Sequence, residues 1–176
     1  MIIESIKYEY LKYKSLAEGA FEQTQEEGLN KVFGEDNNSI SVIVSHISGN
    51  LKSRFTDFLT TDGEKSWRHR DTEFEERELM RNELIKKWNE GWNILLNTLD
   101  DLTDDDLDKT VIIRNKGLTV SDALLRSLAH LSYHVGQIVF IAKIIAGKNW
   151  KSLSIPRGKS EKYNLNPDKE KEGSKN

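Results

Sequence analysis

The chain has 176 residues, which is close to the size of one domain and enough to bury a sizeable core. It contains no cysteine, which excludes disulfides, thiolate catalysis and cysteine-ligated zinc. A net charge of −3, a pI near 5.9 and a mean hydropathy of −0.64 are typical of a soluble protein without overall attraction to nucleic acid. Because no apolar run approaches the roughly 20 residues of a membrane span and no secretory signal is visible, we expect a cytoplasmic protein without a membrane partner.

The first half of the chain predicts two amphipathic helices. Apolar residues recur at alternating spacings of three and four from near the N-terminus to about Gly28, which indicates one long helix. The stretch NKVFGEDNN then breaks the pattern, and Ser39 is a suitable N-cap for a second helix from about Ile40 to Leu59. The residues expected on the buried faces are Ile3, Ile6, Tyr10, Tyr13, Ala17, Ala20 and Thr24, then Ile40, Val44, Ile47, Leu51, Phe55 and Phe58.

The second half predicts two more helices, each opened by a capping box. Thr72 with Glu75 should begin the third helix, and Thr119 with Asp122 the fourth, which should end at Gly147. Between these helices, residues 110–113 and 118–120 can form a small hairpin around a turn at 114–117. The expected buried faces contain Leu84, Trp88, Trp92, Leu95 and Leu99, then Val120, Leu124, Leu131, Val135, Ile138 and Ala142.

This order of elements predicts an all-α fold, a four-helix bundle with a possible β-hairpin between the third and fourth helices. Both prolines, Pro156 and Pro167, follow the fourth helix, so no helix has a proline in its interior. We expect one domain over residues 1–158. The polar residues 159–176 form a tail that we expect to be partly disordered.

Three of the four histidines occupy related positions on the expected helices. His130 and His134 are four residues apart, so their imidazoles share one face of the fourth helix. Apolar residues fill more than half of that helix's circumference, so we expect it to be largely buried. His46 flanks the apolar face of the second helix in the same way. Three such imidazoles can bind one divalent metal ion, although buried histidines are often only hydrogen-bonded.

The segments HLSYHVGQI, TVSDAL and SISVIVSHISGN resemble the DinB-like superfamily of bacterial proteins, and the resemblance extends from residue 1 to about 165. It implies a four-helix bundle, often dimeric, in which His46, His130 and His134 hold a divalent metal. Neutral imidazoles suit zinc or nickel, with iron or manganese as alternatives. The superfamily includes transferases and isomerases that use low-molecular-weight thiols, so the resemblance implies related chemistry here.

A metal ion held by three histidines can lower the pKa of a bound water or thiol, which supplies a nucleophile near neutral pH. We therefore expect a metal-dependent transferase or hydrolase that acts on a small thiol or carboxylate substrate. Two alternatives stay open. One is a non-catalytic metal-binding protein, such as a stress-associated module, and the other is a helical bundle whose histidines only pack.

Further candidate site residues lie near His46 and in the long polar connection TTDGEKSWRHRDTEF. Asn50 and Arg54 continue the row of His46 along the second helix, and we list them with Arg68 and Asp71 as candidate catalytic residues. Arg68 and Arg70 could together clamp a carboxylate, and Glu73 is a second candidate base beside Asp71. We expect Trp67 and Arg68 to reach the groove beside Asn50 and Arg54. The alternative for this connection is a solvated loop with local ion pairs, in which His69 is no ligand.

Apolar residues outside the main stripes predict a contact surface. Tyr8 and Leu11 on the first helix and Phe140 and Ile144 on the fourth lie off the core-facing positions. Together with the resemblance, they predict a homodimer that has one metal site in each subunit.

Overall fold

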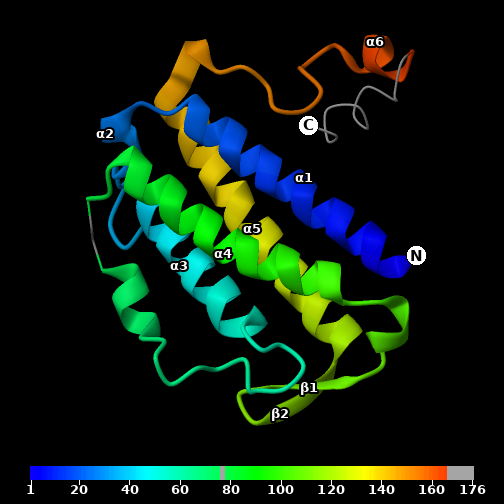
Figure 1. Ribbon diagram of the computed structural model, residues 1–176. Coiled ribbons are helices and arrows are strands. Elements are labelled where there is room, and N and C mark those ends of the chain that lie inside the picture. Colours follow the sequence, from blue (N-terminus) through cyan, green and yellow to red (C-terminus); the bar gives the residue numbers. More distant parts are fainter. Residues whose placement is uncertain (76–77, 166–176) are drawn as a thin grey trace.

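The computed structural model describes residues 1–75 and 78–165. Four long helices lie side by side around a common core: α1 (Ile2–Glu22), α3 (Ile40–Phe55), α4 (Arg81–Asp101) and α5 (Val120–Ala146) (Figure 1). α3 packs mainly against α4 and α1 against α5, while α3 also contacts α5. Every residue expected on the four buried faces is buried except Tyr13, which is partly buried. The prediction of a mainly helical fold with amphipathic helices is therefore confirmed.

Two of the predicted helices end earlier than expected. α1 stops at Glu22, and a separate turn, α2 (Glu26–Leu29), follows it. α3 stops at Phe55 instead of Leu59, because the next residue is extended and Asp57 has a φ of 50°, outside helical geometry.

The predicted N-caps of the second and fourth helices are confirmed. The Ser39 hydroxyl accepts the backbone N–H of Val42 at 3.2 Å, and the Thr119 hydroxyl accepts that of Asp122 at 3.0 Å. At the other end of α5, Gly147 adopts a φ of 54°, a conformation that glycine reaches more easily than other residues. Local sequence signals thus set both ends of α5.

The capping box expected at Thr72 and Glu75 does not begin the third helix. Thr72 lies in a short 3₁₀ helix (Arg70–Phe74), and its hydroxyl donates to the carbonyl of His69 at 2.8 Å. α4 begins only at Arg81, after Met80 in the N-cap position. The prediction was wrong because the Thr72 hydroxyl is used within its own turn.

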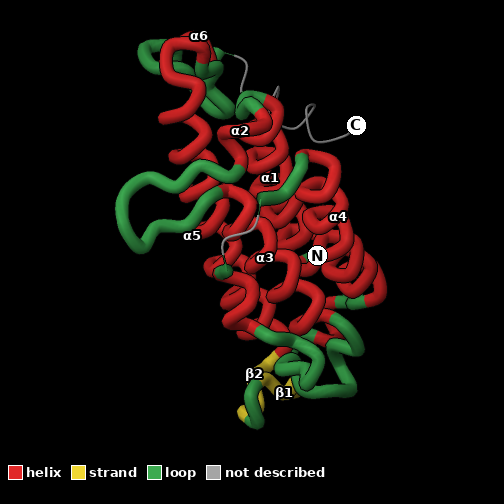
Figure 2. The backbone as a smooth tube through the Cα atoms, turned by 90° about the vertical axis from the view of Figure 1, so that its left-hand side faces the viewer, coloured by secondary structure: helices red, strands yellow, loops and turns green. Residues whose placement is uncertain are grey.

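The predicted hairpin is confirmed, with a tighter turn than expected. Strands β1 (Thr110–Ile113) and β2 (Lys116–Thr119) pair antiparallel, and Ile113 pairs with Lys116. The turn therefore has two residues, Arg114 and Asn115, with φ values of 54° and 59°. Positive φ at both positions is characteristic of a type I′ turn, which suits the twist of a hairpin. The hairpin lies across one end of the long helices (Figures 1 and 2).

The long connection after α3 is tied to this hairpin. The Asp62 carboxylate accepts the backbone N–H groups of Arg114 and Asn115, both at 2.8 Å. The backbone N–H of Gly63 donates to the carbonyl of Ile112 at 2.8 Å. The connection therefore packs on the end of the helices and does not project away from them.

α5 is less buried than its composition predicted. Phe140 is 65% exposed and Ile144 is 47% exposed, so one face of the helix remains open. By length and composition alone, the segment Val120–Asn149 is long and apolar enough to cross a membrane. This corrects the expectation that no segment of the chain approaches the length of a membrane span. Only 22% of its most apolar window is buried, but a core helix of a soluble protein can pass the same test, and α5 packs on α1 and α3.

The division into residues 1–158 and a polar tail stays a prediction. In the described part of the tail, Ser160–Asn164 forms the short helix α6. The disorder expected at the end of the tail concerns residues outside the described ranges.

Candidate metal centre

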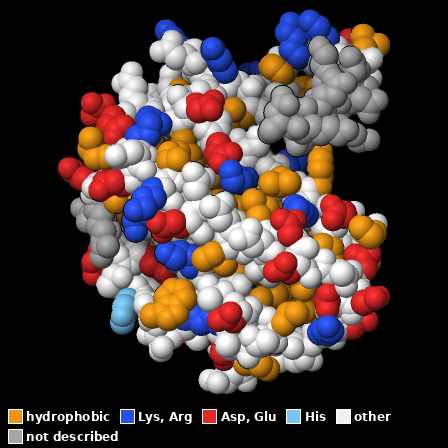
Figure 3. Space-filling view, in the orientation of Figure 1, with side chains coloured by type: hydrophobic (Ala, Val, Ile, Leu, Met, Phe, Trp, Pro, Cys, Tyr) orange, Lys and Arg blue, Asp and Glu red, His pale blue; other side chains and the backbone are white. Residues whose placement is uncertain are grey.

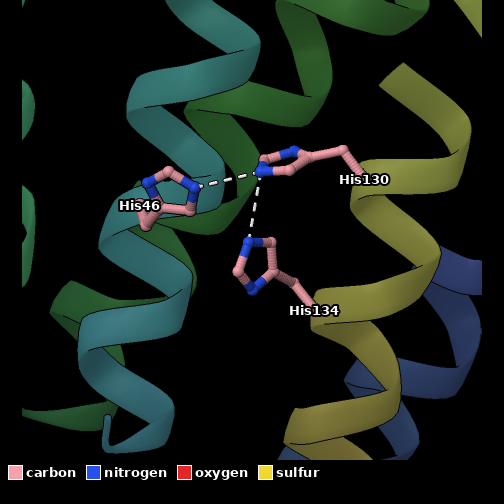
Figure 4. Close-up of side chains that lie close together, drawn as sticks. All are labelled: His46, His130 and His134. Carbon is pink, nitrogen blue, oxygen red and sulfur yellow. Dashed lines mark hydrogen bonds between the residues drawn. The ribbon is translucent and has the colours of Figure 1, made fainter. Parts of the chain in front are cut away.

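Three histidines converge between two neighbouring helices. His46 extends from α3, and His130 and His134 extend from α5, with the three rings directed toward one another (Figure 4). The Nε2 atom of His130 lies 3.1 Å from the Nε2 atoms of both His46 and His134. One potential ligand atom from each residue lies within 4.8 Å of the others. The structure therefore brings together the three histidines that the sequence singled out.

The outward-facing nitrogens of two rings have hydrogen-bond partners. His46 Nδ1–H donates to Glu73 Oε2 at 2.9 Å, and His134 Nδ1–H donates to Gln137 Oε1 at 2.7 Å. An ionised carboxylate can only accept, so its partner nitrogen carries the proton. These bonds fix the ring orientations and leave Nε2 of each neutral ring with a lone pair, as in histidines that bind metals.

Glu73 is itself held by a buried arginine. Arg68 donates through Nε to Oε1 at 2.7 Å and through Nη2 to Oε2 at 2.8 Å, and its side chain is only 2% exposed. Burial raises the pKa of Glu73, but the hydrogen bonds and charges of Arg68 and His46 outweigh burial and hold that pKa below its ordinary value. Glu73 is therefore a charged, fixed acceptor for His46.

A glycine on α3 makes room for this carboxylate. A Cβ atom at Gly49 would lie 2.8 Å from Cδ of Glu73, closer than real Cβ contacts. Only glycine at this position lets Glu73 approach α3 as it does. The backbone of α3 thus contributes to the position of the Glu73 carboxylate as well as to that of His46.

The environment of His130 and His134 favours their neutral forms. Burial, followed by the charges of His134, His46 and the nearby arginines, lowers the pKa of His130 to about 4. Burial also lowers the pKa of His134, although its bond to Gln137 opposes that change. Neutral imidazoles are the form that binds metal ions.

Hydrogen bonding alone does not satisfy three neutral rings in this arrangement. With the protons of His46 and His134 on Nδ1, both of their Nε2 atoms are acceptors. His130 Nε2–H can donate to only one of them, so the other 3.1 Å contact has no proton between its nitrogens. Nitrogens bound tetrahedrally to zinc at roughly 2.0–2.1 Å lie roughly 3.3 Å apart. The two contacts of His130, at 3.1 Å, are close to this separation, and the third pair of nitrogens lies within 4.8 Å, so the three residues could hold one cation.

A cavity of about 390 Å³ adjoins the histidines. Both His46 and His130 line it, and the other lining residues come from the end of α3, the long connection, the hairpin and the start of α5. Four residues singled out in the sequence lie on its wall: Asn50, Arg54, Arg68 and Arg70. The cavity thus gives a small molecule access to one side of the histidine cluster.

Other residues of the long connection lie away from this cavity. Asp71 is exposed and is absent from the lining, so the structure gives it no contact with the histidines. Trp67 is half exposed and, with His69, lines a separate and smaller cavity. The expectation that Trp67 reaches the groove beside Asn50 is therefore wrong, whereas Arg68 does reach it.

Sequence reasoning assigned no role to two residues at the site. Gln137 follows His134 by three positions and hydrogen-bonds its ring. Arg126 precedes His130 by four positions and lines the cavity. Gln137 lies on the same helical row as the two histidines, and extending that row toward the start of the helix would have found Arg126.

Long helices around one core and a histidine cluster between α3 and α5 define a mainly helical protein with a candidate three-histidine metal site. The chain belongs to the family described as "Protein of unknown function (DUF1572)", whose model matches residues 1–159. No curated protein and no solved structure matches the chain. The matched range includes all three histidines and the whole cavity lining.

Proposed function

We propose that this chain is a DinB-like four-helix-bundle protein that uses a divalent metal ion, zinc or nickel, to catalyse a transferase or hydrolase reaction. One observation carries the proposal: Nε2 atoms from facing helices converge while Glu73 and Gln137 anchor the opposite sides of two rings. The DinB-like assignment is supported by the chain order, one histidine on α3 followed by a spaced pair on the last long helix.

A divalent ion with three nitrogen ligands and an open position lowers the pKa of a bound water or small thiol. The residues of this chain would then bind and orient the second reactant in the adjoining cavity. Asn50 lies one helical turn beyond His46 and can hydrogen-bond a polar group there. Arg54 can supply positive charge farther along the same wall. Arg68 is committed to Glu73, so we assign it a positioning role.

An activity screen tests this proposal. The full chain, purified without an affinity tag and loaded with zinc or nickel, is incubated with small thiols and electrophilic acceptors, and separately with hydrolysable esters and amides. We expect metal-dependent turnover that His134→Ala abolishes. Replacing exposed Lys143 by alanine on the same helix should leave turnover unchanged. A metal-loaded protein without any turnover would instead favour the non-catalytic metal-binding alternative.

The proposal includes a cytoplasmic homodimer with one metal site in each subunit. Tyr8, Phe140 and Ile144 are exposed, and Leu11 is partly buried. A second copy that packs on these faces of α1 and α5 would cover apolar surface. Each chain supplies three histidines itself, so the metal site does not require the partner.

A further inference from the structure

The cavity beside the histidines has a wall of one charge. Among the residues that the structure describes, its lining contains five arginines and one lysine but no aspartate or glutamate: Arg54, Arg68, Arg70, Arg114, Lys116 and Arg126. On the face of the molecule seen in Figure 3, by contrast, acidic and basic side chains are interspersed. Clefts lined by charges of one sign attract ligands of the opposite sign.

Nearby carboxylates neutralise only part of this wall. Glu64 Oε2 accepts from Arg114 Nε at 2.8 Å and from Arg54 at 3.2 Å. Glu73 accepts from Arg68, whose buried Nη1 atom has no hydrogen-bond partner among the described residues. Two carboxylates, those of Glu64 and Glu73, thus accept hydrogen bonds from three of the arginines.

The other three cations have no carboxylate partner in the described ranges. The Arg70 guanidinium lies over the Phe74 ring at 5.1 Å, and neither Lys116 nor Arg126 has an ion pair there. Both are exposed, so each can reach a ligand without breaking an existing bond. These cations can therefore bind a negatively charged ligand in the cavity.

The cations are aligned with the histidines along two helices. On α3, Arg54 lies eight residues beyond His46, and on α5, Arg126 lies four residues before His130. At a rise of 1.5 Å per residue, these separations correspond to about 12 Å and about 6 Å along the helix axes. All four of these residues line the cavity, so its imidazoles and guanidiniums lie within the length of one small molecule.

We propose that this cavity binds an oxyanion group, a phosphate or a carboxylate, of a small substrate through Arg126 and Lys116, while the reacting part of that substrate lies at the three histidines. The cavity volume of about 390 Å³ falls within the usual range of small-molecule sites. Calling the ligand a substrate rests on the proposed function, whereas the anion site itself needs no metal.

Calorimetric titration of the metal-free full chain tests the anion site directly. Inorganic phosphate and malonate serve as separate probes, so the chemical group is identified by which of them binds more tightly. We expect saturable binding that Arg126→Gln weakens by about tenfold, since it removes a charge-assisted hydrogen bond. The matched control, Lys143→Gln, removes the same charge from α5 outside the cavity and should keep the wild-type affinity.

Failure of the anion site and failure of the proposed function give different results. If neither probe binds, or if the wild type and both variants bind equally, the anion site is wrong. A chain that binds no metal but shows anion binding dependent on Arg126 would keep the anion site and overturn the metal-dependent function. Metal content is therefore measured on the same preparations.

Discussion

The Nδ1 atom of His46 lies 2.9 Å from Oε2 of Glu73, and the two residues are 27 positions apart in the chain. This hydrogen bond joins α3 to the long connection that follows it. Arg68, from the same connection, donates a hydrogen bond to each oxygen of that carboxylate. The connection therefore forms part of the histidine site.

Replacing Glu73 by glutamine should weaken metal binding. The variant removes the charged acceptor of His46 and leaves the buried Arg68 guanidinium without its carboxylate. Partners of this kind typically change metal affinity by about 10–100-fold, and we expect a loss in that range in competition with a chromogenic chelator. Glu90→Gln, which removes a surface carboxylate paired with Lys52, is the control and should bind metal as the wild type does. Equal affinities for the two variants would contradict the role of Glu73.

Gly49→Ala tests the same contact from the backbone of α3. The added Cβ would lie 2.8 Å from Cδ of Glu73, so the carboxylate must move away from His46. We expect a loss of metal affinity similar to that of Glu73→Gln, with helical circular dichroism unchanged. Wild-type affinity in this variant would show that the position of Glu73 does not matter.

Gly91→Ala should lower the free energy of unfolding, although alanine normally stabilises a helix interior relative to glycine by about 0.5–1 kcal/mol. A Cβ at Gly91 would lie 2.9 Å from the Cα of Ser48, where α4 meets the backbone of α3. We expect a loss of roughly 1–3 kcal/mol, measured by urea denaturation. Gly136→Ala is the control, since no atom lies within 4 Å of its added Cβ. Gly136→Ala should stabilise the protein. If Gly91→Ala does not lower the free energy of unfolding either, the close packing of α3 and α4 is contradicted.

The contribution of Glu64 to stability should depend on pH. Its hydrogen bond to Arg114, aided by Arg54 and opposed by burial, lowers the pKa of Glu64 below 4.5. A carboxylate with a lowered pKa in the folded state stabilises the protein fully above its unfolded pKa, and this stabilisation is lost as the pH falls through the folded pKa. The thermal midpoint of Glu64→Gln should therefore lie below that of the wild type at pH 7 and approach it at pH 3. A difference in thermal midpoint that is the same at both pH values would be inconsistent with a stabilising ion pair between Glu64 and the two arginines.

Features that depend on local sequence could be predicted. The buried helix faces follow from hydrophobic periodicity, and the Ser39 and Thr119 caps follow from side chains that act three residues away. The positions of His130 and His134 on one face likewise follow from their spacing. The helix start predicted at Thr72 was wrong because its hydroxyl donates to a backbone carbonyl of its own turn and does not cap a following helix.

Contacts between residues far apart in the sequence could not be predicted. The sequence offered Glu73 as a candidate base, but its bond to His46 depends on how the connection folds back over α3. The basic wall also needs the hairpin to bring Arg114 and Lys116 beside α5. No local pattern reports such long-range placement, so these contacts become visible only in the fold.

The metal content of this chain tests the central claim most directly. The chain is purified without an affinity tag, equilibrated with zinc or nickel, freed of excess metal and analysed by plasma mass spectrometry beside His130→Ala. We expect one metal ion per chain in the wild type and a loss of stoichiometric binding in the variant, which should remain folded because the helix faces supply most of the stability. Equal metal content in the two proteins, or no metal in the wild type, would contradict the three-histidine site.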